Sequence, residues 1–162
     1  MPPFTFGPPA ANENDRRREV AILGHLLEVG IQRVGPPRSE ASYETEIVSK
    51  GLIDTGASDV CIDYRLAERL GLKVIDQTMV GVVGYTTPAK IYLGRLVIPQ
   101  LGFDRKMRLY ALKVRHATHE ILLGRSFLQN YVVTFDGPAG MYTFSRPQDF
   151  QTHSTIEDDF AT

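Results

Sequence analysis

Residues 52–58 read Leu-Ile-Asp-Thr-Gly-Ala-Ser, and this short stretch decides how the rest of the chain is interpreted. The two apolar residues before the aspartate are typical of the end of a buried strand. Gly56 permits a tight turn that a Cβ atom would hinder, and the hydroxyl of Thr55 can tie the turn to a neighbour. The pattern therefore predicts that the carboxylate of Asp54 sits partly buried on a rigid turn.

A second informative stretch, at residues 121–128, reads Ile-Leu-Leu-Gly-Arg-Ser-Phe-Leu. Three apolar residues followed by a glycine predict a buried strand that stops at Gly124. The residues after that glycine favour a short helix at 125–130.

The rest of the central chain shows mainly a period of two. Leu27, Val29 and Ile31 alternate with more polar residues, and similar alternation recurs at 43–48, 89–94 and 107–112. Such alternation is typical of half-buried antiparallel strands. Two further apolar runs, at 131–135 and 141–144, flank a Gly- and Pro-containing turn, which predicts a hairpin.

One further helix is predicted just after the Asp-Thr-Gly turn. Asp63 can cap its start, Leu66 and Leu70 share one face with Ile62, and Gly71 supplies a left-handed end. Many short strands with two short helices indicate a small, mostly β domain.

Together the two motifs resemble those of the retropepsin-like aspartic proteases, over about residues 25–144. The resemblance implies a single-domain acid-protease fold, a closed antiparallel β barrel with one or two short helices. It also implies an active homodimer, because the chain contains one Asp-Thr-Gly. The second aspartate would have to come from another copy of the chain.

The resemblance also assigns roles to individual residues. The expected catalytic turn is Asp54, Thr55 and Gly56. The expected substrate-binding residues follow that turn or lie in a glycine-containing hairpin, the flap, and they are Ala57, Ser58, Asp59, Gly81, Val82, Val83, Gly84 and Tyr85. The expected structural supports are Leu123, Gly124 and Arg125.

One departure from the family concerns the partner of Arg125. Many retroviral enzymes carry an aspartate where this chain has Ser58. Arg125 must therefore find another partner, and Asp59 and backbone carbonyls are the two candidates.

The chemistry implied by the resemblance needs two neighbouring carboxylates. Two such groups cannot both ionise cheaply, so they share one proton. The unprotonated one can take a proton from water while the other donates to the scissile carbonyl. Hydrolysis of a polypeptide then requires no metal, cofactor or covalent intermediate.

Other interpretations remain open at this point. Asp54 can belong to an ordinary turn, residues 79–90 can form a plain hairpin, and the fold can serve as a dimerising or peptide-binding module with little cleavage. His116 and His119 have a metal-like spacing but lack further ligands in the pattern. Cys61, in an apolar context, is expected to be a small buried hydrophobe.

Composition narrows the class of protein further. Hydrophobic residues make up 43% of the 162 residues, which is enough for a core, and the net charge of −1 gives no electrostatic footprint for nucleic acid or membrane. The sequence has neither a signal-peptide pattern nor an apolar run of membrane-spanning length. With its single cysteine, the chain is expected to be cytoplasmic.

The expected organisation is one protease domain between two tails. Residues 1–19 are rich in proline and charge and are expected to form a mobile arm. Residues 20–146 are expected to form the protease domain. Residues 147–162 are expected to form a flexible acidic tail.

Overall fold

The computed structural model describes residues 3–36, 43–114 and 116–147. Its helices are α1 (Glu13–Leu23), α2 (Tyr64–Arg69), the 3-10 helix η1 (Pro99–Leu101) and α3 (Arg125–Leu128). Its strands are β1 (Phe4–Phe6), β2 (Leu26–Arg33), β3 (Glu46–Ile53), β4 (Cys61–Asp63), β5 (Lys73–Val82), β6 (Tyr85–Ile98), β7 (Phe103–Leu112), β8 (Ile121–Leu123), β9 (Val132–Asp136) and β10 (Met141–Ser145).

The larger sheet closes into a barrel. Its strand order is β2-β3-β8-β4-β7-β6-β5, and an additional pairing between β2 and β6 joins the ends, which leaves β5 outside the closed ring. Most pairings are antiparallel, but β8 runs parallel to β3 and β4 runs parallel to β7. The predicted mostly β class and closed barrel are confirmed, while alternation along the sequence could not reveal the two parallel pairings.

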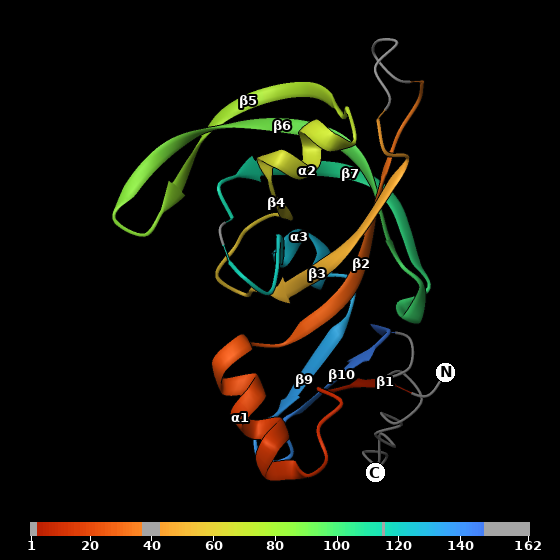
Figure 1. The fold of residues 1–162 in the computed structure, drawn as a ribbon, viewed down its shortest axis with the longest axis vertical. Helices are drawn as coiled ribbons and strands as arrows, with labels where there is room; N and C mark the ends of the chain where they lie inside the picture. Colours follow the sequence, from red (N-terminus) through yellow and green to blue (C-terminus); the bar gives the residue numbers. More distant parts are fainter. Residues whose placement is uncertain (1–2, 37–42, 115, 148–162) are drawn as a thin grey trace, which may run out of the picture.

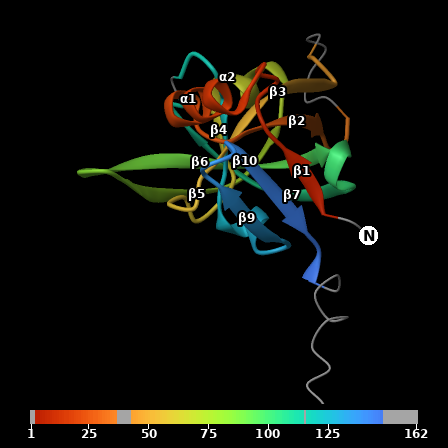
Figure 2. The same cartoon turned by 90° about the horizontal axis from the view of Figure 1, so that it is seen from below.

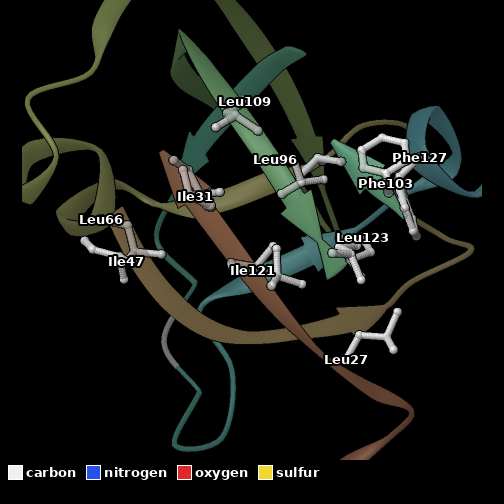
Figure 3. Close-up of a cluster of buried hydrophobic side chains, with 14 of the residues drawn as sticks. Leu27, Ile31, Ile47, Leu66, Leu96, Phe103, Leu109, Ile121, Leu123 and Phe127 are labelled. Carbon is white, nitrogen blue, oxygen red and sulfur yellow. The ribbon is translucent and has the colours of Figure 1, made fainter. Parts of the chain in front are cut away.

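The barrel encloses the hydrophobic core. Alternate residues of β2 point inward, so that Leu27, Val29 and Ile31 are buried as predicted. Figure 3 shows Ile121 and Leu123 of β8 among side chains that come from several strands. The core also includes Ile53 of β3 and Ile62 of β4, the strands before and after the Asp-Thr-Gly turn, so both ends of the turn are anchored in the barrel.

A smaller sheet lies at one end of the barrel (Figure 1), with the order β1-β10-β9. The hairpin of β9 and β10 matches the prediction. The ring of Tyr142 stacks on Phe6 with centroids 5.5 Å apart, and its hydroxyl donates to the carbonyl of Leu26. These contacts attach the small sheet to the start of β2.

The N-terminal segment differs from the mobile arm expected at residues 1–19. Phe4–Phe6 pairs with β10, and both phenylalanines pack against the core. Helix α1 begins after Asn12, whose side chain accepts a hydrogen bond from the Asp15 backbone, and ends at Gly24 with φ +76°. Strand β1 is three residues long and lies between prolines, and helix α1 buries none of its residues. Neither element therefore shows the periodic apolar pattern by which strands and helices are predicted from sequence.

Two remaining expectations concern the tail and the membrane. Of the predicted tail at 147–162, all but Pro147 lies outside the described residues. Within the part of the chain that the structure describes, no helix has the length and apolarity needed to cross a membrane.

Helix α2 is anchored by a buried aspartate at its N-terminus. The side chain of Asp63 is fully buried, and it accepts hydrogen bonds from the backbone N–H of Arg65 at 3.0 Å and from the Arg65 Nε at 2.7 Å. Burial raises the pKa of Asp63, but the hydrogen bonds and charge of Arg65 outweigh it, so that the pKa lies below its usual value. Ionised Asp63 therefore stabilises the fold.

Replacing this cap should destabilise the protein. We expect Asp63→Ala to lower the free energy of unfolding by about 1–3 kcal/mol, because it removes a helix cap and charge-assisted hydrogen bonds. Since the pKa of Asp63 is lower in the folded state, this contribution is present above the unfolded-state value of about 4 and is lost as pH falls from there. Urea titrations at neutral and acidic pH measure both effects. Asp104→Ala, which removes an exposed ion pair with Arg95, serves as the control, and an equal loss in both variants would contradict this account.

Candidate active site

The aspartate of the Asp-Thr-Gly motif is held on a turn directly after β3. Its backbone N–H donates to the carbonyl of Leu123 at 3.1 Å. Its Oδ1 atom accepts hydrogen bonds from the backbone N–H of Gly56 at 2.9 Å and of Ala57 at 3.3 Å. Asp54 is half-buried, whereas Thr55 and Gly56 are exposed. The turn therefore orients one carboxylate oxygen through its own backbone and presents its tip to the outside.

Strand β8 supports this turn from behind. It pairs in parallel with β3, with Leu122 opposite Leu52 and Leu123 opposite Ile53. It also pairs antiparallel with β4. The strand that carries Asp54 and the strand that follows the turn are thus joined through β8, which limits movement of the turn.

Gly124 marks the point where the chain passes closest to the turn. A Cβ atom added there would lie 2.2 Å from the carbonyl oxygen of Asp59 and 2.8 Å from that of Ala57. Real Cβ atoms do not approach backbone oxygens so closely, and neither oxygen belongs to a flexible side chain. The close passage therefore requires glycine for steric reasons, and its φ of −80° is an ordinary one.

Arg125 fastens the turn from the outside. Its Nη1 donates to the carbonyl oxygens of Thr55 at 2.8 Å and Gly56 at 3.1 Å, and its Nη2 donates to the hydroxyl of Ser58 at 2.9 Å. Its backbone N–H donates to the carbonyl of Ala57 at 2.9 Å. Of the two candidate partners, the backbone carbonyls are found, together with the Ser58 hydroxyl.

The hairpin of β5 and β6 projects from the barrel (Figures 1 and 2). The two strands pair from Lys73 to Val82, and the turn at Val83 and Gly84 includes a φ of +84° at the glycine. The side chain of Val83 is 98% exposed, and Tyr85 beside it is also exposed. The expected flap segment is therefore a long hairpin with an apolar, solvent-exposed tip.

A cavity of about 360 Å³ lies between the Asp-Thr-Gly turn and this hairpin. Its walls are Gly56, Ser58 and Asp59 from the turn, Cys61 from β4, residues 78–81 from β5, and Tyr110 from β7. The structure thus brings one edge of the turn together with the expected flap residue Gly81.

The other expected flap residues lie elsewhere. Val82 and Tyr85 line a second cavity of about 510 Å³, which Leu122 also borders. The sequence did not predict that Cys61 and Tyr110 would face a cavity. Cys61 lies on β4 and Tyr110 on β7, and these strands, distant in the sequence, pair in parallel with the two residues opposite each other. The sequence signal that Tyr110 faces away from the core was its alternation with Leu109 and Ala111, which are both buried.

The two histidines of the His-x-x-His sequence stack on one another. The rings of His116 and His119 are 4.4 Å apart, and the Nδ1 atoms of both lie within hydrogen-bonding distance of the Thr118 hydroxyl. Burial and the neighbouring His116 lower the pKa of His119. Over the described ranges, no group of three or more His, Cys, Asp or Glu residues could hold a metal ion.

The close passage of Gly124 leads to a direct stability test. Gly124→Ala should destabilise the protein by several kcal/mol, on the order of 2–4, because backbone oxygens must move to admit the methyl group. Gly137→Ala is the matched control, since nothing lies within 4 Å of a Cβ atom at that position. Thermal and urea unfolding compare the two variants, and equal stability would show that the passage tolerates a side chain.

The match to a known protein family agrees with this arrangement. The sequence model of the aspartyl protease family matches residues 46–127, which include both the Asp-Thr-Gly turn and Gly124-Arg125. Among solved structures, the chain is similar to the solution structure of Simian Foamy Virus (mac) protease, at 17% identity and a TM-score of 0.43, over 65% of this chain and 92% of that one. No curated protein matches the chain. Because the family match covers half of the chain and includes its two characteristic motifs, the chain belongs to the aspartyl protease family.

Proposed function

We propose that the protein is an aspartic endopeptidase that works as a homodimer, with Asp54 of each copy contributing to one active site. The observation that carries the proposal is the Asp-Thr-Gly turn, in which backbone N–H groups orient the carboxylate of half-buried Asp54 while Thr55 and Gly56 are exposed. The sequence contains this motif once, so a pair of catalytic carboxylates requires two chains.

The geometry of the turn suits the chemistry of a shared proton. When two such turns meet at a twofold axis, the carboxylates share one proton because a second charge is costly at short range. The ionised one takes a proton from a water molecule, which attacks the scissile carbonyl, and the protonated one donates to the carbonyl oxygen. The hydrogen bonds from Gly56 and Ala57 fix the direction of one oxygen of the Asp54 carboxylate.

The supports of the turn match what catalysis requires. Catalytic groups must be held within a fraction of an ångström of their productive positions. In this protein, the hydrogen bonds from Arg125 and the close passage of Gly124 hold the turn on two sides. We assign both residues, with Leu123, to positioning rather than to contact with the substrate.

A free sheet edge beside the turn suits the pairing of two copies. Among the described residues, β9 pairs with β10 along one side and with no strand along the other. The ring of Phe135 on β9 lies 4.7 Å from that of His25, whose carbonyl accepts a hydrogen bond from Ile53, the residue before Asp54. Val132 and Phe135 are also exposed. A second copy that added its β9 here would bring the two turns towards one axis.

An extended polypeptide would occupy the space between the turn and the β5–β6 hairpin. We propose that its backbone pairs with the hairpin as an added strand, in the region of Gly81 to Tyr85. Its side chains would enter the cavities beside the hairpin, where Gly56, Ser58 and Asp59 form the facing wall.

The first test removes the proposed catalytic carboxylate. Asp54→Asn should lower cleavage of a peptide library by a factor on the order of a hundred to ten thousand, because it removes general acid–base catalysis. Circular dichroism and sedimentation should show the fold and assembly unchanged. Asp104→Asn, a surface change of the same kind, should retain wild-type activity. If Asp54→Asn cleaves within about tenfold of the wild type, the catalyst lies elsewhere.

The second test concerns assembly. We expect the protein to sediment as a dimer at working concentration, and Val132→Asp combined with Phe135→Asp should weaken that dimer and lower activity in parallel. Ile75→Asp is a matched control, because Ile75 is 40% exposed while Val132 and Phe135 are 39% and 43% exposed. A monomer that still cleaves peptides would contradict the pairing, and an unchanged dimer in the double variant would remove the role of β9.

A further inference from the structure

We propose that Asp59 makes the cavity beside the catalytic turn a subsite for a positively charged substrate side chain, that of lysine or arginine. The inference rests on the proposed protease function, because it concerns the chemistry of the substrate at that site. It assigns Asp59 the role of a specificity-determining residue.

Asp59 contributes the only side-chain charge among the residues that line this cavity in the described part of the chain. Asp59 is half-buried as a residue, and its side chain has no hydrogen bond or ion pair with any described residue. A carboxylate that lines a cavity and has no partner favours a bound cation, because a charge-assisted hydrogen bond forms there at closer range than in bulk water. The cavity therefore has an unsatisfied preference for positive charge.

Two arginines in the described part of the chain, one beside the turn and one two residues from Tyr110, have partners other than Asp59. Arg125, which is adjacent to the turn, donates to two carbonyls and to the hydroxyl of Ser58. Arg108 on β7 pairs with Asp76 at 2.8 Å. Neither arginine neutralises Asp59, so its charge is available to a group that enters the cavity.

The other walls suit the aliphatic part of a long side chain. Cys61 is buried, and burial together with the charges of Asp59 and Asp54 raises the pKa of its thiol to about 12, so this wall stays uncharged. Met79 and Val80 of the hairpin add apolar surface. Lysine and arginine bury their methylene stems along such surface while the charged end reaches a polar group. The volume of about 360 Å³ lies at the small end of the range for ligand pockets.

The proposed twofold symmetry extends this preference to both sides of the scissile bond. Each copy brings one Asp59 near one Asp54, so a substrate in the shared groove meets two equivalent cavities. A peptide with basic residues on both sides of the cleavage point should therefore be preferred over one with a single basic residue.

The test compares peptides that differ in charge alone. Each position flanking the cleavage point carries either lysine or norleucine, which has a similar aliphatic stem without the ammonium group. In the wild type, kcat/KM should favour lysine at one position on each side by a factor on the order of ten or more. In Asp59→Asn that ratio should fall to near one, while Asp104→Asn should keep the wild-type ratio.

A second measurement separates this inference from the proposed function. Binding of the same peptides to Asp54→Asn reports the charge preference without cleavage, and Asp54→Asn combined with Asp59→Asn should lose that preference. If the wild type cleaves nothing but the binding preference depends on Asp59, the proposed protease activity is wrong and the subsite stands. A ratio unchanged by Asp59→Asn, or a dimer lost in that variant at the same concentration, would overturn the subsite.

Discussion

The site depends on one close steric contact, the passage of Gly124 beside the carbonyl oxygens of Ala57 and Asp59. Because Gly124 has no side chain, β8 can end directly against the turn, and the next residue, Arg125, can reach over the turn. The turn is thereby held between a buried strand and a guanidinium group. Without that contact, the hydrogen bonds that orient Asp54 would belong to a loop free to change its shape, and a catalytic carboxylate needs a fixed position.

Two neighbouring aspartates illustrate how the same residue type serves different purposes. Asp54 accepts hydrogen bonds from its own turn, which fixes the direction of one of its carboxylate oxygens. Asp59, five residues later, has no described partner and lines the cavity beneath the hairpin. The first arrangement suits a group that exchanges protons at a fixed place, and the second suits a group that selects what binds. The difference arises from backbone geometry, which places N–H groups around one carboxylate and a cavity beside the other.

Features set by local sequence could be predicted, and features set by distant pairing could not. The turn at Asp54, the helix cap at Asp63 and the hairpin of β9 and β10 each follow from a few adjacent residues. By contrast, β1 exists because Phe4 pairs with Phe144, at the far end of the described chain. The partners of Arg125 and the cavity walls formed by Cys61 and Tyr110 likewise come from strands that meet only in the folded barrel. Family resemblance supplied the roles that spacing alone left open, and the family match confirms that resemblance.

The central claim is that one active site requires two chains, and mixing experiments test it most directly. Wild-type protein is mixed with increasing amounts of Asp54→Asn at constant total concentration, under conditions in which chains exchange between dimers. If each site needs an Asp54 from both copies, activity falls as the square of the wild-type fraction, because mixed dimers are inactive. A fall in simple proportion to the wild-type fraction would show that each chain carries a complete site, and it would contradict the account.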